Sequence, residues 1–161
     1  MKKFFLMLML LAPMTMMAQK FGKVNTQTIM QALPDVAKAN GELEALQKQK
    51  ENDLKAMQDE FQRKADEYQK ASSTMAATVK QQKETELQNL QQKIQQAYQD
   101  GQQELQKKSN ELMQPIVAKV RTAIETVGKA GNYTYIFEDG AAVYAGSNVV
   151  DVTKEVQAKI K

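Results

Sequence analysis

The chain has 161 residues, about the length of one domain, with 22 basic and 19 acidic side chains and a formal net charge of +3. It contains no cysteine and no histidine, which excludes disulfides, thiolate metal sites and histidine-activated nucleophiles. No glycine-rich phosphate loop or paired-carboxylate motif is present either. We therefore expect no enzymatic activity, no catalytic residue, no cofactor and no metal.

Residues 1–18 are predicted to be a cleavable signal peptide. Lys2 and Lys3 precede an apolar run of eight residues, and Ala18 is the expected last residue before cleavage. The run is shorter than the roughly twenty residues that span a bilayer, although an uncleaved anchor is an alternative. Removing two lysines and no acid lowers the formal charge from +3 to +1. The mature chain is thus expected to be soluble, exported and unsuited to binding nucleic acid.

The mature chain begins with a short predicted strand and a helix. Residues 21–25 alternate between apolar and polar side chains, which favours a strand. Residues 26–33 follow as a helix that Asn25 or Thr26 would cap. Pro34 then suits the first turn of the next helix.

Residues 34–114 are predicted to form a long antiparallel coiled-coil hairpin with its tip near residues 72–78. Apolar residues recur at steps of three, four and seven in both halves. They are Val36, Leu43, Leu46, Leu54, Met57, Phe61 and Tyr68 in the first arm and Leu87, Leu90, Ile94, Tyr98, Leu105 and Leu112 in the second. If the chain reverses near Thr74, the sequence numbers of two residues that face each other across the arms add to 147 or 148, as for Phe61 and Leu87. Each arm would extend roughly 55 Å. A single continuous rod that dimerises is the alternative.

The surface of this hairpin is expected to be solvated. Residues 35–112 contain 12 basic and 14 acidic residues, interspersed, which is not the pattern of a nucleic-acid-binding surface. The second arm carries eleven glutamines between Gln81 and Gln106. These either keep the helix soluble with little charge or form an adaptable hydrogen-bonding surface for unfolded chains. Gly101 costs the helix about 1 kcal/mol relative to alanine. It either permits close packing against Leu46 or marks a hinge of the arm.

The C-terminal part predicts more strands. Pro115 is expected to break the helix, and a further helical run reaches Val127. Residues 133–137 are predicted to be a strand, with residues 141–145 pairing back after a turn at residues 138–140. Residues 149–150 are predicted to be extended, and a last helix through Ile160 is expected to be capped by Asp151 or Thr153.

The predicted fold class is therefore α+β, with the hairpin inserted into a small β-rich body. That body comprises residues 19–33 and 115–161, about 60 residues, which are too few for a generous core. Its strand edges would also remain unpaired in a single copy. We expect a symmetric oligomer in which the body is the oligomerisation domain.

The motifs at the two ends of the mature chain resemble those of the Skp/OmpH-like periplasmic chaperones. The residues that carry the resemblance are 21–27, 131–133, 143–145 and 151–156, although Asn25 stands where the family favours Asp. The resemblance implies a homotrimer whose β-rich body bears three helical tentacles around a cavity. It also implies an ATP-independent holdase that binds unfolded outer-membrane proteins and prevents their aggregation before they reach the outer membrane.

The tip of the hairpin departs from the basic tentacles of well-known family members. Its lysines are matched in number by acids: Lys64, Lys70, Lys80 and Lys83 against Asp66, Glu67, Glu84 and Glu86. This balance argues against contact with anionic lipid or lipopolysaccharide. Met75 and Val79 are instead the candidate substrate-binding residues, with a simple structural role for Met75 as the alternative.

Two other functions fit parts of the pattern. A structural or adaptor protein could use the same hairpin to dock a folded envelope partner, although such adaptors usually carry additional β domains. A cytosolic prefoldin-like chaperone also has coiled-coil arms. Its strands lie between the helices, however, and the predicted signal peptide argues against the cytosol.

Overall fold

The computed structural model describes residues 19–160, so the predicted signal peptide lies outside the described residues. The elements follow one another as β1 (Phe21–Val24), α1 (Thr26–Ala32), α2 (Pro34–Ala71), α3 (Ala77–Ala130), β2 (Tyr135–Glu138), β3 (Val150–Asp151) and α4 (Thr153–Lys159). They form two compact units. The arm unit comprises residues 27–121, and the sheet unit comprises residues 19–26 and 122–160.

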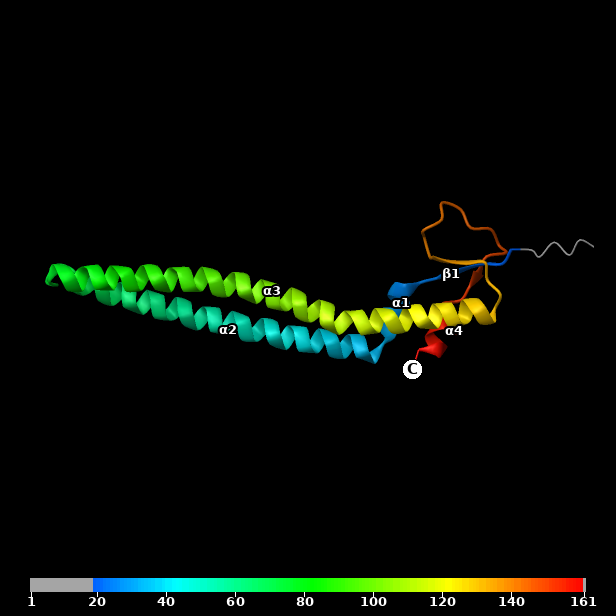
Figure 1. Cartoon of the computed structure of the whole chain (residues 1–161), viewed down its shortest axis with the longest axis horizontal. Coiled ribbons are helices and arrows are strands. Elements are labelled where there is room, and N and C mark those ends of the chain that lie inside the picture. The colour runs from blue at the N-terminus through cyan, green and yellow to red at the C-terminus, as the bar shows by residue number, and fades with distance from the viewer. Residues whose placement is uncertain (1–18, 161) are drawn as a thin grey trace, which may run out of the picture. The chain divides into compact units, whose positions relative to one another are not determined.

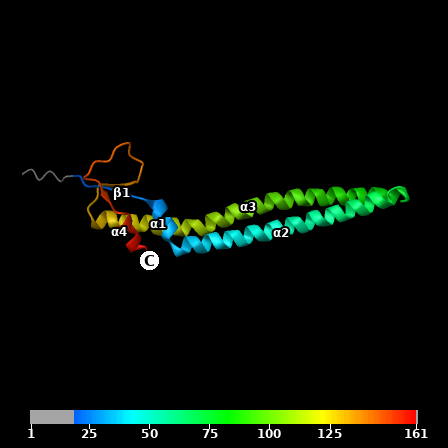
Figure 2. The ribbon, with the colours of Figure 1, turned by 180° about the vertical axis from the view of Figure 1, so that it is seen from behind.

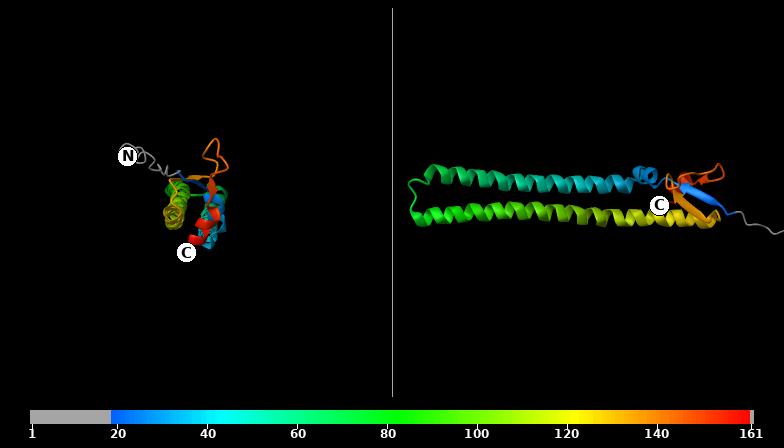
Figure 3. Two further views of the ribbon diagram at one scale, coloured as in Figure 1. Left: turned by 90° about the vertical axis from the view of Figure 1, so that its right-hand side faces the viewer. Right: turned by 90° about the horizontal axis from the view of Figure 1, so that it is seen from above.

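The arm unit is a long antiparallel helical hairpin, as the sequence predicts. Helices α2 and α3 lie side by side in each view and reverse at residues 72–76 (Figures 1, 2 and 3). Pro34 occupies the first turn of α2, where its missing N–H costs nothing. Asp35 in that first turn and Lys70 in the last one complement the helix dipole.

Most predicted seam residues are shielded between the two helices. Every one of them is half-buried except Tyr98, which is 58% exposed. Ala97 is half-buried in its place, so the seam continues one residue earlier than predicted. A two-helix hairpin leaves its seam accessible from both sides, which explains why these side chains are half-buried rather than fully buried.

The pairing of the two arms differs from the predicted register by a few residues. Inter-arm ion pairs join residues whose sequence numbers add to 150, as in Glu42–Lys108 and Lys64–Glu86, or to 154, as in Lys50–Glu104 and Asp35–Lys119, rather than to 147 or 148. Side chains on a helix lean toward its N-terminus, so each covers a spot about one position before its own Cα. In an antiparallel pair both leanings add, which accounts for about two positions of this difference.

Helix α3 continues through Pro115, so the predicted break there is wrong. Proline removes one backbone hydrogen bond and costs a helix interior about 3 kcal/mol. Here its neighbours favour continuity, because Leu112 is half-buried, Ile116 is buried, and both line a hollow with Ala39 of α2. Packing against α2 therefore outweighs the local preference.

The sheet unit contains three parallel strands in the order β2-β1-β3. Phe21 is in register with Tyr135, and Gly22 is in register with Val150. The predicted pairing of residues 141–145 with the preceding strand is wrong, because these residues form an exposed loop. Strands that run in the same direction cannot be joined by a tight hairpin. Residues 139–149 therefore lead the chain from the end of β2 back to the side of the sheet where the parallel strand β3 begins.

One face of β1 is buried in the sheet unit. Gly22 and Val24 are buried while Phe21 and Lys23 are half-buried, in the alternation expected of a strand. A Cβ on Gly22 would lie 3.2 Å from the Tyr133 ring, which favours glycine there. The other buried apolar side chains of this unit are Ala123, Val127, Val152 and Val156.

Hydrogen bonds join the distant ends of the chain in this unit. The Asn25 N–H donates to Thr153 Oγ1 at 2.9 Å, and the Thr26 N–H donates to Glu138 Oε1 at 2.9 Å. Asp151 Oδ1 accepts bonds from both the N–H and the hydroxyl of Thr153, where α4 begins. Within residues 19–160, no helix is both long and apolar enough to cross a membrane.

Candidate functional site

The tip of the arm unit is a short turn whose polar groups are satisfied locally. Ser72 Oγ donates to the Gln69 carbonyl, and both the N–H and the hydroxyl of Thr74 donate to the Ala71 carbonyl. These bonds satisfy carbonyls that the end of α2 would otherwise leave free. Met75 is half-buried in the turn, and Val79 is 40% exposed in the first turn of α3. The two predicted contact residues therefore lie within the same short segment, and Val79 in particular offers apolar surface to a partner.

Several of the charged side chains near the tip pair with one another. Arg63 lies 2.7 Å from Glu67, and Lys83 lies 3.4 Å from Glu86. The Tyr68 hydroxyl donates to Glu84 across the two arms, and this bond raises the pKa of Tyr68. Such exposed pairs contribute little stability individually, but they reduce the field that a charged ligand would meet.

Gly101 is buried in α3, where the atoms nearest to an added Cβ belong to the aliphatic part of Lys50 and not to Leu46. A Cβ at this position would meet Lys50 Cγ at 3.7 Å, an ordinary contact distance. Lys50 Nζ lies 2.6 Å from Glu104, and that hydrogen bond raises the pKa of the lysine. Packing therefore does not require glycine here. Gly101 lies roughly 33 Å along the helix from Val79, so the structure does not bring the two together.

A second candidate surface lies in the sheet unit. The rings of Phe21, Tyr135 and Phe137 stack with centroids 5.6 to 6.4 Å apart, yet Tyr135 is 58% and Phe137 44% exposed. The sequence alone does not single out this cluster, although the aromatic residues that alternate along positions 133–137 are a signal of it.

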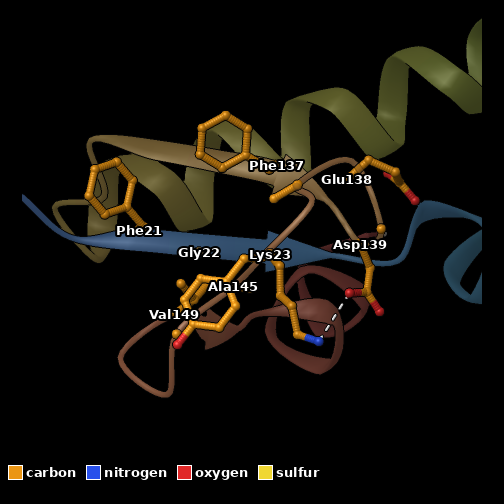
Figure 4. A pocket seen from close by; sticks show the side chains of 12 residues that line it. Phe21, Gly22, Lys23, Phe137, Glu138, Asp139, Ala145 and Val149 are labelled. Carbon is orange, nitrogen blue, oxygen red and sulfur yellow. Dashed lines mark hydrogen bonds and ion pairs between the residues drawn. The ribbon is translucent and has the colours of Figure 1, made fainter.

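A pocket of about 390 Å³ lies beside these rings (Figure 4). Its walls include Phe21, Phe137, Tyr144 and Val149. Lys23 Nζ lies 3.0 Å from Asp139 at this site, and the hydrogen bond between them raises the pKa of Lys23. A largely apolar surface of this kind suits contact with another apolar surface better than it suits chemistry.

Neither surface has the features of a metal centre. Among residues 19–160, no group of three or more carboxylates is arranged to hold a metal ion.

Comparison with known proteins identifies the family. Residues 20–160 match the model of the family described as outer membrane protein (OmpH-like). Two curated relatives are each named Chaperone protein Skp. The one from Pectobacterium atrosepticum is 25% identical over 144 residues, covering 89% of this chain and 87% of its own length. The one from Yersinia enterocolitica is 26% identical over 154 residues, covering 96% and 93%.

A solved structure shares the fold. The crystal structure of a protein from Caulobacter crescentus CB15, described as an outer membrane chaperone (OmpH-like), superposes with a TM-score of 0.77. It is 16% identical, and the match covers 88% of this chain and 83% of that one. The family match spans nearly all of the described residues, and the resemblance noted from the sequence is confirmed: the chain belongs to the OmpH-like outer membrane protein family.

Proposed function

We propose that this protein is an ATP-independent periplasmic holdase that binds unfolded outer-membrane proteins and prevents their aggregation in transit. The observation that carries the proposal is the arm unit, an exposed helical hairpin in a chain of the OmpH-like family. The relatives named Chaperone protein Skp support the same function. The predicted signal peptide of residues 1–18 supports the periplasm as its location.

The arm is suited to weak and reversible binding. Its seam is built from half-buried apolar residues, and its outer faces are polar and exposed. A client bound by many small contacts can leave without an energy source, because no single contact has to be broken by nucleotide hydrolysis. Met75 and Val79 are proposed as apolar client contacts at the tip. The paired charges of the tip support binding that does not depend on anionic lipid or lipopolysaccharide.

A homotrimer is proposed as the working assembly. The sheet unit supports it in two ways: the aromatic cluster around Phe137 is exposed, and within residues 19–160 the outer edges of β2 and β3 pair with no other strand. Val143 and Tyr144 add further exposed apolar surface in the loop that follows β2. A neighbouring copy would cover these groups.

The function is tested by diluting a denatured outer-membrane β-barrel protein from urea and following its aggregation by light scattering. Stoichiometric amounts of the mature protein should suppress the aggregation without ATP. Unchanged aggregation at a several-fold excess would contradict the holdase function. Stable binding of one folded envelope protein, with no binding of unfolded chains, would instead favour the adaptor function.

A further inference from the structure

The outward face of α3 carries a continuous row of uncharged polar side chains. Opposite the seam, ten positions follow one another at alternating steps of four and three residues, so they line up along one face of the helix. We call them the amide stripe: Thr78, Gln82, Thr85, Asn89, Gln92, Gln96, Gln99, Gln103, Gln106 and Asn110. All ten are exposed, and none carries a charge.

The corresponding face of α2 is different. Its positions opposite the seam include Glu44, Lys48, Lys55, Asp59 and Asp66. Solubility alone would be served by either composition, and α2 shows that charged residues suit this hairpin. The two arms therefore present different chemistry on equivalent faces.

Much of the hydrogen-bonding capacity of the stripe is unused within the described chain. Gln96 donates to Asp100, Gln106 donates to Asn110, and the Thr85 hydroxyl donates to the Gln81 carbonyl. Among residues 19–160, no intramolecular side-chain hydrogen bond is found for Gln82, Asn89, Gln92, Gln99 or Gln103. Each of these amides offers two donor hydrogens and an acceptor oxygen.

The surface is also hollowed where the stripe begins near the tip. A depression of about 530 Å³ is lined by Thr78, Gln81, Gln82, Thr85, Glu86 and Asn89. Glu86 is the charged residue of this set, and it lies within 3.7 Å of Lys64 and 3.4 Å of Lys83. The field of its carboxylate is therefore reduced by two lysines.

We propose that the amide stripe is where the arm binds extended segments of unfolded polypeptide through their backbone. The two surfaces are complementary in charge, because a peptide backbone is neutral and presents donors and acceptors, and the stripe is likewise neutral and presents both. Such a surface carries no charge that would repel a client of either sign, whereas the face of α2 carries charges of both signs. The stripe extends roughly 48 Å, enough for about 14 residues of extended chain. This proposal rests on the holdase function.

The test measures the affinity of a fluorescent, urea-unfolded outer-membrane β-barrel protein for two matched variants. Gln92→Ala combined with Gln99→Ala removes two amides from the stripe. Gln49→Ala combined with Gln58→Ala removes two exposed glutamines from α2, for which no hydrogen bond is found among residues 19–160. Alanine favours helix in all four places, so both variants should unfold at or above the wild-type temperature.

The stripe variant should bind the client about tenfold more weakly, because each lost hydrogen bond is worth about threefold in affinity. The α2 variant should bind like the wild type. A photo-crosslinking residue at position 92 should crosslink to the client, and one at position 52 in α2 should not.

The outcomes separate this proposal from the proposed function. Wild-type affinity in the stripe variant, or crosslinks at position 92 that join only arms of two copies, would overturn the stripe while leaving the holdase intact. If the wild-type protein itself does not bind the unfolded client, the holdase function fails first.

Discussion

At the scale of single residues, the sheet unit depends on a few polar contacts that join segments far apart in the sequence. Asp151 is one of them, since its carboxylate accepts two hydrogen bonds from Thr153. The side-chain bond first, and then the backbone bond, lower the pKa of Asp151 below its ordinary value of 3.8. Its contribution to folding therefore depends on pH in a predictable direction.

Asp151→Asn tests this contribution. Because the pKa of Asp151 is lowered in the folded state, the stability from its charge is present above pH 3.8 and is lost as pH falls through the lowered value. The variant should be less stable than the wild type at pH 7, and the difference should close in acid, where the protonated aspartic acid resembles asparagine. Urea unfolding at both pH values measures it. If the difference in stability between the variant and the wild type persists in acid, the effect comes from the shape of the side chain and not from its charge.

Gly101→Ala tests the proposed hinge of the arm. The added methyl group would meet Lys50 Cγ at 3.7 Å, so it fits, and the helix should gain about 1 kcal/mol of stability. If the glycine lets the arm bend, the variant should bind small clients normally and large clients more weakly.

Gly41→Ala is the matched control, because a Cβ there meets nothing within 4 Å and the residue also lies inside a helix. It should stabilise α2 similarly without changing the range of clients. Equal binding of small and large clients by the Gly101 variant would leave the hinge without a functional role.

At the scale of the elements, the hairpin was predictable and the sheet was less so. Heptad spacing and a shared reversal point identify two arms because both signals are local and repeated many times. The fine register depends on how side chains lean, and the continuity of α3 at Pro115 depends on packing against Ala39, so neither follows from periodicity.

The predicted strand pairing in the sheet is wrong for a related reason. Residues 141–145 have the composition of a strand, but pairing partners are decided by the path of the chain. Strand β2 pairs in parallel with β1, which comes more than a hundred residues earlier. Composition alone suggests Met75 and Val79 as tip contacts, whereas the aromatic cluster around Phe137 forms only because β1 and β2 lie side by side.

Tyr68→Phe tests whether the inter-arm hydrogen bond to Glu84 fastens the tip. We expect faster amide hydrogen exchange in residues 65–90 and an almost unchanged unfolding midpoint, because the bond is exposed and local. Tyr98→Phe, at a 58% exposed position of the same arm unit, is the control and should leave exchange unchanged. Equal exchange in both variants would mean that the apolar seam alone closes the tip.

At the scale of the whole molecule, the proposed assembly brings several copies together. A single sheet unit leaves Tyr135, Phe137 and Tyr144 exposed, which is costly for a protein that works as a monomer. Covering this surface would also complete the small core of the unit.

Phe137→Ser combined with Tyr135→Ser tests this assembly. Light scattering of the mature wild-type protein should give about three times the monomer mass. The variant should dissociate toward monomer, because it loses the stacked rings that a neighbouring copy would cover. Circular dichroism should show that α2 and α3 remain helical. A wild-type protein that stays monomeric at every concentration would contradict the trimer.

The central claim is that the arm binds many different unfolded clients rather than one folded partner. It is tested most directly by crosslinking the protein inside its own cells, isolating it and identifying what it carries by mass spectrometry. The account predicts a range of outer-membrane β-barrel proteins, crosslinked to the arm unit through segments that are buried in their folded forms. Recovery of a single folded envelope protein, always at the same contact, would contradict it.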